Sequence, residues 1–439
     1  MKDTPIEEQF VKQALQESGI RQVGKASIRE IVKLVNLIEK ASGEKFIRME
    51  MGVPGLSPSA VGVRAEIQAL EAGVASVYPM IEGVDALKEE ISRFAKLFLN
   101  IRVNPVNCLP TVGSMQGALA TFMVTSRRDP SKDTTLFIDP GFPVQKQQHR
   151  VLGLKYRNFD VYEFRGEKLR NKLESILKEG NISSILYSNP NNPSWICFTE
   201  KELAIIGELA TRYGAIVIED LAYFGMDFRK DYSRPGVPPY QPTVANYTQD
   251  YILLVSSSKI FSYAGQRIGS LLVSDSLFTR EFSRLEFWFG TQIFGRALVY
   301  GALYSLSSGC SHSAQYALAA MLKAANDGTF DFVDEVKEYG RKAATMKELF
   351  IRNGFNIVYN KDEDQPLADG FYFTISYPGF SGAELLGELL FYGISAITLD
   401  ITGSDRTEGL RACVSQVLPE QFSALEKRLM KFRDHHPVA

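Results

Sequence analysis

Two segments of the chain place apolar residues at helical spacing. In SIREIVKLVNLIEKA (27–41) apolar residues recur every three or four positions, and TEKELAIIGELATRYG (199–214) does the same between Thr199 and Gly214. Such a period indicates an amphipathic helix. Thr199 with Glu202 forms a capping-box pattern, and a glycine commonly ends a helix. We therefore expect two helices that pack against a core.

Short apolar runs predict strands between such helices. They are bounded by turn residues and lack strict alternation, which is typical of strands buried on both faces. The runs are TLFID (135–139), SSILYS (183–188), AIVIE (215–219), ILLVS (252–256) and SLLV (270–273). Strands that alternate with helices favour an α/β domain with a mainly parallel sheet covered by helices.

The two ends of the chain have a different pattern. FIRMEMGVPG (46–55) predicts a strand that runs into a Gly-Pro turn, and 313–353 continues a helical pattern into short strand-like and helix-like runs. These features predict a smaller α+β domain formed from residues 1–55 and 311–439, beside a large domain over 56–310. A polar, proline-rich connection at 228–250 is long for a compact domain, and such loops are often functional.

Composition narrows the function classes. The 439 residues carry a net charge of −2 and no basic block, so nucleic acid is not an expected partner. The four cysteines are far apart and form no CxxC pair, so neither a disulfide framework nor a zinc site is expected, and a cytoplasmic location fits. Only four histidines are present, which leaves little material for a histidine-based metal site. The sequence has no signal-peptide pattern and no apolar run of about 18 residues, so no membrane span is expected.

Polar residues follow several of the predicted strands, which is where open α/β sheets bind ligands. The segments are TVGSMQGAL (111–119), DPGFP (139–143), YSNPNNP (187–193), IED (218–220) and SSSK (256–259). The first opens a helix, where backbone N–H groups can bind an anion. Each segment also has an ordinary structural interpretation as a turn, a cap or a solvated charge.

Taken in order, these motifs resemble a known family. SSSKIFSYAGQRIG (256–269), NPNNP (189–193) and the D-x-A-Y pattern at 220–223 are similar to signatures of class I/II aminotransferases, pyridoxal 5′-phosphate (PLP) enzymes of fold type I. The resemblance covers nearly the whole chain. It implies PLP as the cofactor, an amino acid and a 2-oxo acid as substrates, and a homodimer with active sites at the interface.

The resemblance also implies roles for individual residues at the cofactor ring. Lys259 would be the Schiff-base lysine and proton shuttle, and Asp220 would pair with the pyridine nitrogen. Asn192 and Tyr223 would hydrogen-bond the phenolic oxygen, and Phe142 would stack on the ring face.

A second set would bind the phosphate and the substrate. The phosphate would be held by Gly113, Ser114, the N–H group of Met115, Ser256 and Arg267. Tyr78 resembles the tyrosine that reaches the phosphate of the neighbouring subunit. Arg411 would bind the substrate α-carboxylate, with Gly52 and Asn192 beside it, because a guanidinium matches a carboxylate.

One departure from the family pattern concerns the turn after Asn192. Ser194-Trp195 stands where the family has Thr-Gly. A glycine there often uses positive φ, so we expect the tryptophan to impose another backbone conformation.

Three rival functions are weighed against an aminotransferase. A β-eliminating lyase or a decarboxylase would use the same lysine, aspartate and arginine. A regulator with an aminotransferase-like domain needs an N-terminal DNA-binding segment, and only about 25 residues precede SIREIV. A cofactor-free homologue is disfavoured because Lys259, Asp220, Asn192, Tyr223 and Arg267 occur together.

Overall fold

The computed structural model describes residues 3–438, and the chain divides into two compact units. The large unit comprises Leu56–Pro190 and Cys197–Val336. The small unit comprises the chain up to Gly55, the short segment Asn191–Ile196, and the chain from Lys337 onwards. Each unit has its own sheet.

The large unit is built on a seven-stranded sheet with the strand order β2-β8-β7-β6-β5-β3-β4. Neighbouring strands from β4 to β7 are parallel, whereas β8 is antiparallel to both β7 and β2, so the predicted, mainly parallel sheet is confirmed. The strands are β2 (Cys108–Thr111), β3 (Thr134–Asp139), β4 (Lys155–Asp160), β5 (Ile182–Ser188), β6 (Ile216–Asp220), β7 (Tyr251–Ser256) and β8 (Gly269–Val273). Every residue of β5, β6, β7 and β8 is buried, which explains their near-continuous apolar sequences.

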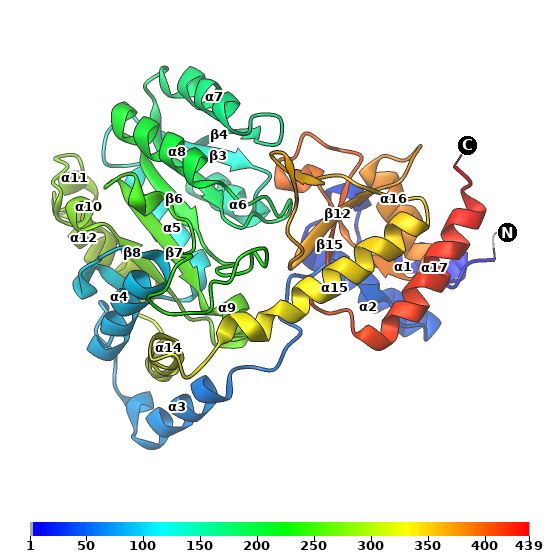
Figure 1. The fold of residues 1–439 in the computed structure, drawn as a ribbon, viewed down its shortest axis with the longest axis horizontal. Helices are drawn as coiled ribbons and strands as arrows, with labels where there is room; N and C mark the ends of the chain where they lie inside the picture. The colour runs from blue at the N-terminus through cyan, green and yellow to red at the C-terminus, as the bar shows by residue number, and fades with distance from the viewer. Residues whose placement is uncertain (1–2, 439) are drawn as a thin grey trace. The chain divides into compact units, whose positions relative to one another are not determined.

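Helices surround this sheet (Figure 1). The longer ones are α3 (Ala60–Glu71), α4 (Asp85–Leu99), α5 (Gly113–Thr125), α6 (Pro143–Leu152), α7 (Glu167–Leu177), α8 (Glu200–Tyr213) and α14 (His312–Asn326). Shorter ones are α9 (Ser257–Ile260), α10 (Asp275–Thr279), α11 (Leu285–Phe289), α12 (Phe294–Arg296) and α13 (Tyr304–Ser307). Helix α8 begins with the predicted capping box of Thr199 and Glu202 and ends at Gly214, so that prediction is confirmed.

The small unit contains a four-stranded antiparallel sheet with the order β14-β15-β12-β9. Its strands are β9 (Asn356–Ile357), β12 (Tyr372–Ser376), β14 (Ile397–Thr398) and β15 (Leu410–Cys413). Two further pairs are short: β1 (Ile47–Arg48) with β13 (Ile394–Ser395), and β10 (Lys361–Asp362) with β11 (Gln365–Pro366). The helices are α1 (Glu8–Ser18), α2 (Ile28–Ser42), α16 (Gly382–Leu389) and α17 (Phe422–His435).

The long helical pattern at 313–353 is interrupted in the structure. It forms α14, which ends at Asn326, and α15 (Phe332–Arg352), which begins in the large unit and ends in the small unit. Gly328 lies between them with φ +71°, and Thr329 N–H donates to the Ala324 carbonyl at 2.9 Å. A left-handed glycine ends a helix without the steric cost that a Cβ would bring. The helical pattern is therefore broken at the polar residues Asn326, Asp327 and Gly328.

No helix among residues 3–438 is long and apolar enough to cross a membrane. Within the same range, no group of three or more His, Cys, Asp or Glu side chains is placed to hold a metal ion. All four cysteines are buried, and none of them forms a disulfide bond.

Glu219, on β6, gives the large unit a pH-dependent stability. Its carboxylate is fully buried and accepts hydrogen bonds from Thr243 Oγ1 at 2.5 Å, Val244 N–H at 3.1 Å and Asn189 Nδ2 at 3.5 Å. Burial raises the pKa of Glu219 from its ordinary 4.5 to about 7. The folded protein therefore binds this proton more tightly than the unfolded chain does, and stability falls as pH rises through that interval.

We expect the Glu219→Gln variant to lack this dependence. The free energy of unfolding of the wild type, measured relative to the variant by urea unfolding, should decrease between about pH 4.5 and 7 and then level off. A difference that stays constant with pH would contradict the assignment of the raised pKa to Glu219.

Candidate active site

The parallel strands end at one edge of the large sheet, and two candidate catalytic groups follow adjacent strands there. Asp220 is the last residue of β6, and Lys259 lies in α9, directly after β7. Strands β6 and β7 pair in parallel, with Asp220 opposite Leu254. Because the carboxyl ends of parallel strands form the ligand-binding edge, a carboxylate and an amine are presented on the same side of the sheet.

The Lys259 segment is fixed by its serines and by Tyr263. Ser256 Oγ accepts the Ser258 N–H at 3.2 Å and caps α9. Ser257 Oγ donates to the Ile268 carbonyl at 2.6 Å, and Tyr263 Oη donates to Glu66 Oε2 at 2.6 Å. These bonds restrict the backbone on both sides of the lysine.

Asp220 is held by one backbone donor and one side-chain donor. Its Oδ1 accepts the Ala222 N–H at 3.1 Å, and its Oδ2 accepts Gln145 Nε2 at 3.0 Å. Burial raises the pKa of Asp220 to about 6, and the two hydrogen bonds oppose that rise. Gln145 was not predicted as a site residue. Its position three residues after Phe142 was the only signal, and it is weak because a glutamine in a helix is commonplace.

Strand β8 brings the candidate phosphate-binding residues together. Gly269, its first residue, pairs with Ser256 on β7 and with Thr111 on β2. Arg267 precedes this pairing by two residues, and Gly113, which opens α5, follows Thr111 by two. The two residues consequently meet: a Cβ on Gly113 would lie 2.5 Å from Arg267 Nη2.

This contact has the chemistry of an anion site. Gly113 has φ +66° and no Cβ, so the guanidinium approaches the first turn of α5 closely. The N–H groups of Ser114 and Met115 lie in the same turn, where they have no helical acceptor. Free N–H groups at a helix N-terminus and an arginine fork together favour a phosphate.

Two predicted aromatic residues lie in the large unit, just after the ends of strands β3 and β6. Phe142, half-buried, follows β3 and precedes α6, while Tyr223 is 4% exposed in the turn after β6. With an amine, a buried carboxylate, an anion site and these rings, the donor set fits PLP, which carries an aldehyde, a basic ring nitrogen and a phosphate.

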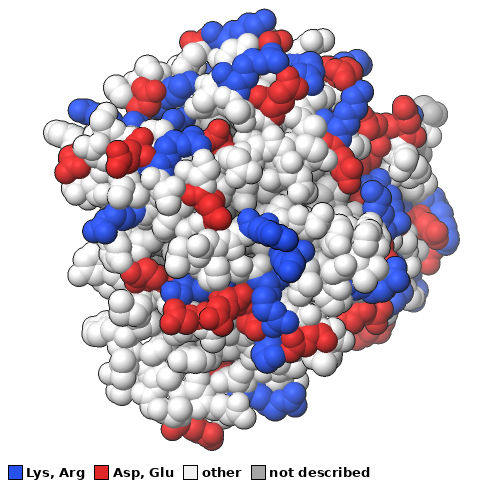
Figure 2. Space-filling model, turned by 60° about the vertical axis from the view of Figure 1, so that its left-hand side comes forward, with Lys and Arg blue, Asp and Glu red and all other residues white. Residues whose placement is uncertain are grey.

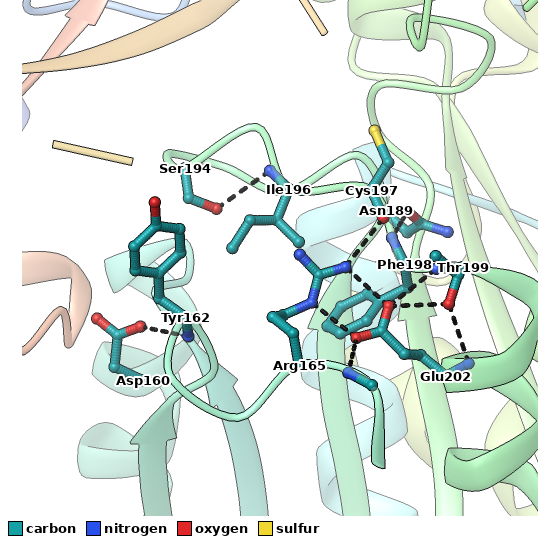
Figure 3. A network of polar contacts seen from close by, with 11 residues as sticks. Asp160, Tyr162, Arg165, Asn189, Ser194, Ile196, Cys197, Phe198, Thr199 and Glu202 are labelled. Atoms are coloured by element: carbon teal, nitrogen blue, oxygen red, sulfur yellow. Dashed lines mark hydrogen bonds and ion pairs between the residues drawn. The ribbon is translucent and has the colours of Figure 1, made fainter. Parts of the chain in front are cut away.

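The NPNNP segment is anchored at its base in the large unit (Figure 3). Asn189 Oδ1 accepts the Phe198 N–H at 3.1 Å. Arg165 Nη2 donates to the Cys197 carbonyl at 3.3 Å and to Glu202 Oε2 at 2.7 Å, while its Nε donates to Glu202 Oε1 at 2.7 Å. The ion pair of Arg165 and Glu202 has two parallel hydrogen bonds and is buried. It therefore fixes the chain at Cys197, just after the NPNNP segment.

Arg411 and Asn192 meet in the small unit. Arg411, on β15, is 1% exposed, and its Nη1 donates to Asn192 Oδ1 at 3.4 Å. Its Nη2 donates to the Glu50 carbonyl at 2.7 Å, and its guanidinium carbon lies 4.6 Å from the centre of the Tyr372 ring. A stacked, hydrogen-bonded guanidinium has little conformational freedom left to lose when it binds a carboxylate.

Gly52 also belongs to this group. A Cβ at Gly52 would lie 1.9 Å from Tyr372 Oη, so only glycine fits where the tyrosine approaches the backbone. Tyr372 itself was not predicted, because an aromatic residue on a strand is usually a core residue.

The expectation for Trp195 was wrong. Trp195 keeps the positive φ that the family glycine uses, with φ +65°, and its N–H donates to the Asn191 carbonyl at 2.9 Å. Ser194 Oγ donates to Asn191 Oδ1 at 2.6 Å within the same turn. Tertiary packing explains why a bulky residue is tolerated in this region: the indole is 1% exposed and lies directly against Gly370.

We expect Gly370→Ala to destabilise the protein by about 1–3 kcal/mol, because an added Cβ would lie 2.0 Å from the Trp195 indole. Urea unfolding would measure the change. Gly387→Ala is the matched control, since a Cβ there meets nothing within 4 Å. A Trp195→Ala background should relieve the cost of Gly370→Ala, and a cost that is unchanged in that background would contradict this contact.

Tyr78 is placed differently from the other predicted residues. It is 91% exposed on the large unit, with Val77 and Met80 also exposed beside it in the chain. Together with Val106, Val299 and Tyr300, Tyr78 and Met80 line a groove of about 810 Å³. Figure 2 turns the side of α10–α12 forward and shows a continuous uncharged area at its lower left.

Comparisons with known proteins agree with this fold. The chain is 26% identical over 260 residues to a protein of Methanocaldococcus jannaschii named "probable aspartate aminotransferase", and 25% identical over 234 residues to the LL-diaminopimelate aminotransferase of Natranaerobius thermophilus. These matches cover 59% and 53% of this chain, and 64% and 58% of the relatives' own lengths. The chain thus spans less than two thirds of either relative.

Solved structures match over a longer range. A single mutant of Thermus thermophilus aspartate aminotransferase superposes with a TM-score of 0.73 at 16% identity, covering 93% of this chain and 97% of that one. Alanine aminotransferase from Pyrococcus furiosus gives 0.72 at 18% identity, with coverage of 94% and 98%. At these identities the likeness shows the fold. The profile of the family "Aminotransferase class I and II", whose members depend on PLP, matches residues 44–363, well over half of the sequence. The chain therefore belongs to the class I and II aminotransferase family.

Proposed function

We propose that this chain is a PLP-dependent aminotransferase that moves an amino group between an L-amino acid and a 2-oxo acid by a ping-pong mechanism. The observation that carries the proposal is the convergence, within the large unit, of Lys259, Asp220 and the Arg267–α5 anion site at the edge where the strands end. The names of the relatives support the reaction class.

Each of these groups has a separate task. Bound PLP supplies an aldehyde that condenses with amines and a ring that takes up the electron pair released at the substrate Cα. Lys259 binds the cofactor through its amine and moves the proton between Cα and C4′. Asp220 keeps the ring nitrogen protonated, and Tyr223 and Asn192 donate to the phenolic oxygen. Ser256, Arg267 and the first turn of α5 bind the phosphate.

Arg411 is proposed to bind the α-carboxylate of the amino acid. The Glu50 carbonyl, the Tyr372 ring and Asn192 hold its guanidinium, and Gly52 leaves room beside Tyr372. A fixed guanidinium can form two parallel hydrogen bonds to a carboxylate, which orients the substrate as well as binding it.

We also propose a homodimer in which Tyr78 reaches the phosphate of the partner's site. Its near-complete exposure, beside exposed Val77 and Met80, is unusual for an aromatic residue and is typical of a surface that another chain covers. We further expect the enzyme to act in the cytoplasm, since its four buried thiols suit a reducing compartment.

A mixing experiment tests the shared site. Lys259→Ala and Tyr78→Ala proteins should each be weak alone, and hybrid dimers should regain about one wild-type site, because one site in each hybrid has both residues intact. A mixture of Lys259→Ala with Asp220→Asn is the control, because those two residues belong to the same chain's site. If neither mixture regained activity, the result would contradict the shared site.

The reaction class is tested by absorption spectroscopy of the holoenzyme with a panel of L-amino acids. We expect the visible band of bound PLP to convert to that of the pyridoxamine form with certain amino acids, and to return on addition of a 2-oxo acid. Accumulation of ammonia while the band persists would instead establish elimination, and release of CO₂ would establish decarboxylation.

A further inference from the structure

Helix α6 makes three contacts with separate parts of the site edge. Gln145 Nε2 donates to Asp220 Oδ2 at 3.0 Å, and Lys146 Nζ donates to Asp139 Oδ2, at the end of β3, at 2.5 Å. Gln148 Nε2 donates to the Met115 carbonyl, in the first turn of α5, at 2.9 Å. Gln145 and Gln148 are three residues apart and therefore lie on one face of the helix. Helix α6 is thus tied to the strand beside it and to the anion site.

The Gln145 side chain has little freedom within this framework. It is 2% exposed, and its backbone is held by a hydrogen bond from its N–H to the Phe142 carbonyl and by His149 Nδ1 at its own carbonyl. Asp220 accepts its other hydrogen bond from the Ala222 N–H, which its own turn supplies. Gln145 therefore donates to Asp220 through its side chain, from an element outside β6 and the turn that follows it.

The chemistry of the donor matters because Asp220 is buried. Burial favours the protonated carboxylic acid, which could not pair with a protonated ring nitrogen, and hydrogen bonds to the carboxylate favour the ionised form. An amide donor stabilises the negative charge without adding a positive charge that would compete with the ring nitrogen. A carboxamide is thus suited to keep Asp220 ionised and available.

We infer that Gln145 is a positioning residue that holds Asp220 ionised and fixed in orientation, and thereby sets the protonation of the cofactor's ring nitrogen. The inference rests on the role proposed above for Asp220 and adds a residue that acts only through it.

The test compares wild type with Gln145→Met, which keeps the length of the side chain and removes the donor. Gln147→Met is the matched control, since Gln147 is exposed on the same helix and contacts Arg150. Each holoenzyme is loaded with PLP labelled with ¹⁵N at the ring nitrogen, whose NMR shift reports its protonation. The dissociation constant of PLP, and kcat and KM for the amino acid, are measured on the same proteins.

For Gln145→Met we expect the ¹⁵N shift to move toward that of a neutral pyridine near pH 8. The PLP dissociation constant should rise about 10-fold, as for loss of a hydrogen bond to a charged group. The kcat should fall while KM changes little, and Gln147→Met should match wild type throughout. Gln145→Leu serves the same purpose if the methionine variant does not fold.

The outcomes separate the two levels of the proposal. A protonated ring nitrogen in wild type that stays equally protonated in Gln145→Met, with unchanged PLP affinity, would overturn the role of Gln145 alone. A wild-type protein that binds no PLP, or whose ring nitrogen is neutral, would overturn the proposed role of Asp220 and the function built on it. A loss of thermal stability with no change in the ¹⁵N shift would assign Gln145 a structural role only.

Discussion

Replacing Lys259 by alanine should reduce transamination by at least about 10⁴-fold, because the variant loses both the amine that binds the cofactor and the group that moves the proton. PLP should still enter the site, since Asp220 and the Arg267–α5 anion site are unchanged. Its absorption spectrum should then be that of non-covalently bound aldehyde. The measurement is the spectrum of the variant before and after dialysis, with the single-turnover rate for an amino acid.

Lys259→Arg supplies the control for charge. A guanidinium keeps the positive charge but stays protonated, so it cannot act as an amine nucleophile or accept the proton. We expect it to be as inactive as the alanine variant. Substantial activity in either variant, or a covalent PLP band in both, would remove Lys259 from its assigned role.

Replacing Arg411 by lysine should reduce kcat/KM for amino acids by on the order of 10²- to 10³-fold, as expected when a buried charge pair loses its geometry. A lysine retains one positive charge but cannot make two parallel hydrogen bonds or stack on Tyr372 in the same way. The measurement is kcat/KM for the amino acid, with the rate for an amine that lacks the carboxylate measured beside it.

The rate with the amine should show whether Arg411→Lys impairs binding of the carboxylate or disturbs the fold. Its slow reaction should be the same in wild type and in Arg411→Lys, because it has no carboxylate to bind. Arg428→Lys is the matched control: Arg428 also lies in the small unit and donates to backbone carbonyls, those of Gly393 and Lys45. An equal loss for the amine and the amino acid, or an equal effect of Arg428→Lys, would show that Arg411 acts on the fold.

Local patterns predicted the features that depend on local physics. The capping box of α8 and five of the seven strands of the large sheet follow from residues that are neighbours in sequence, whereas β2 and β4 were not predicted. The spacing between Lys259 and Arg267 places them on the two sides of the turn between β7 and β8, so that segment could be interpreted directly.

Features that depend on distant residues had no comparable signal. Trp195 keeps a left-handed backbone while its indole packs against Gly370, which is far away in the chain. The bond from Gln145 to Asp220 joins a helix to a strand end, and no periodicity reports it. The break between α14 and α15 is different: the polar residues Asn326, Asp327 and Gly328 interrupt the apolar pattern there, so this boundary had a local signal that was missed.

The adjacent carboxylates Glu219 and Asp220 limit which insertions and deletions strand β6 can tolerate. Successive side chains of a strand point to opposite faces, so Glu219 is directed to Thr243, Val244 and Asn189 while Asp220 is directed to Gln145. Deleting or inserting one codon within β6 would exchange the two faces, leaving each carboxylate among the wrong partners. Residues 234–240 of the connection after β6 belong to no helix or strand and are mostly exposed, so insertions and deletions among homologues should accumulate there and be absent from the strand.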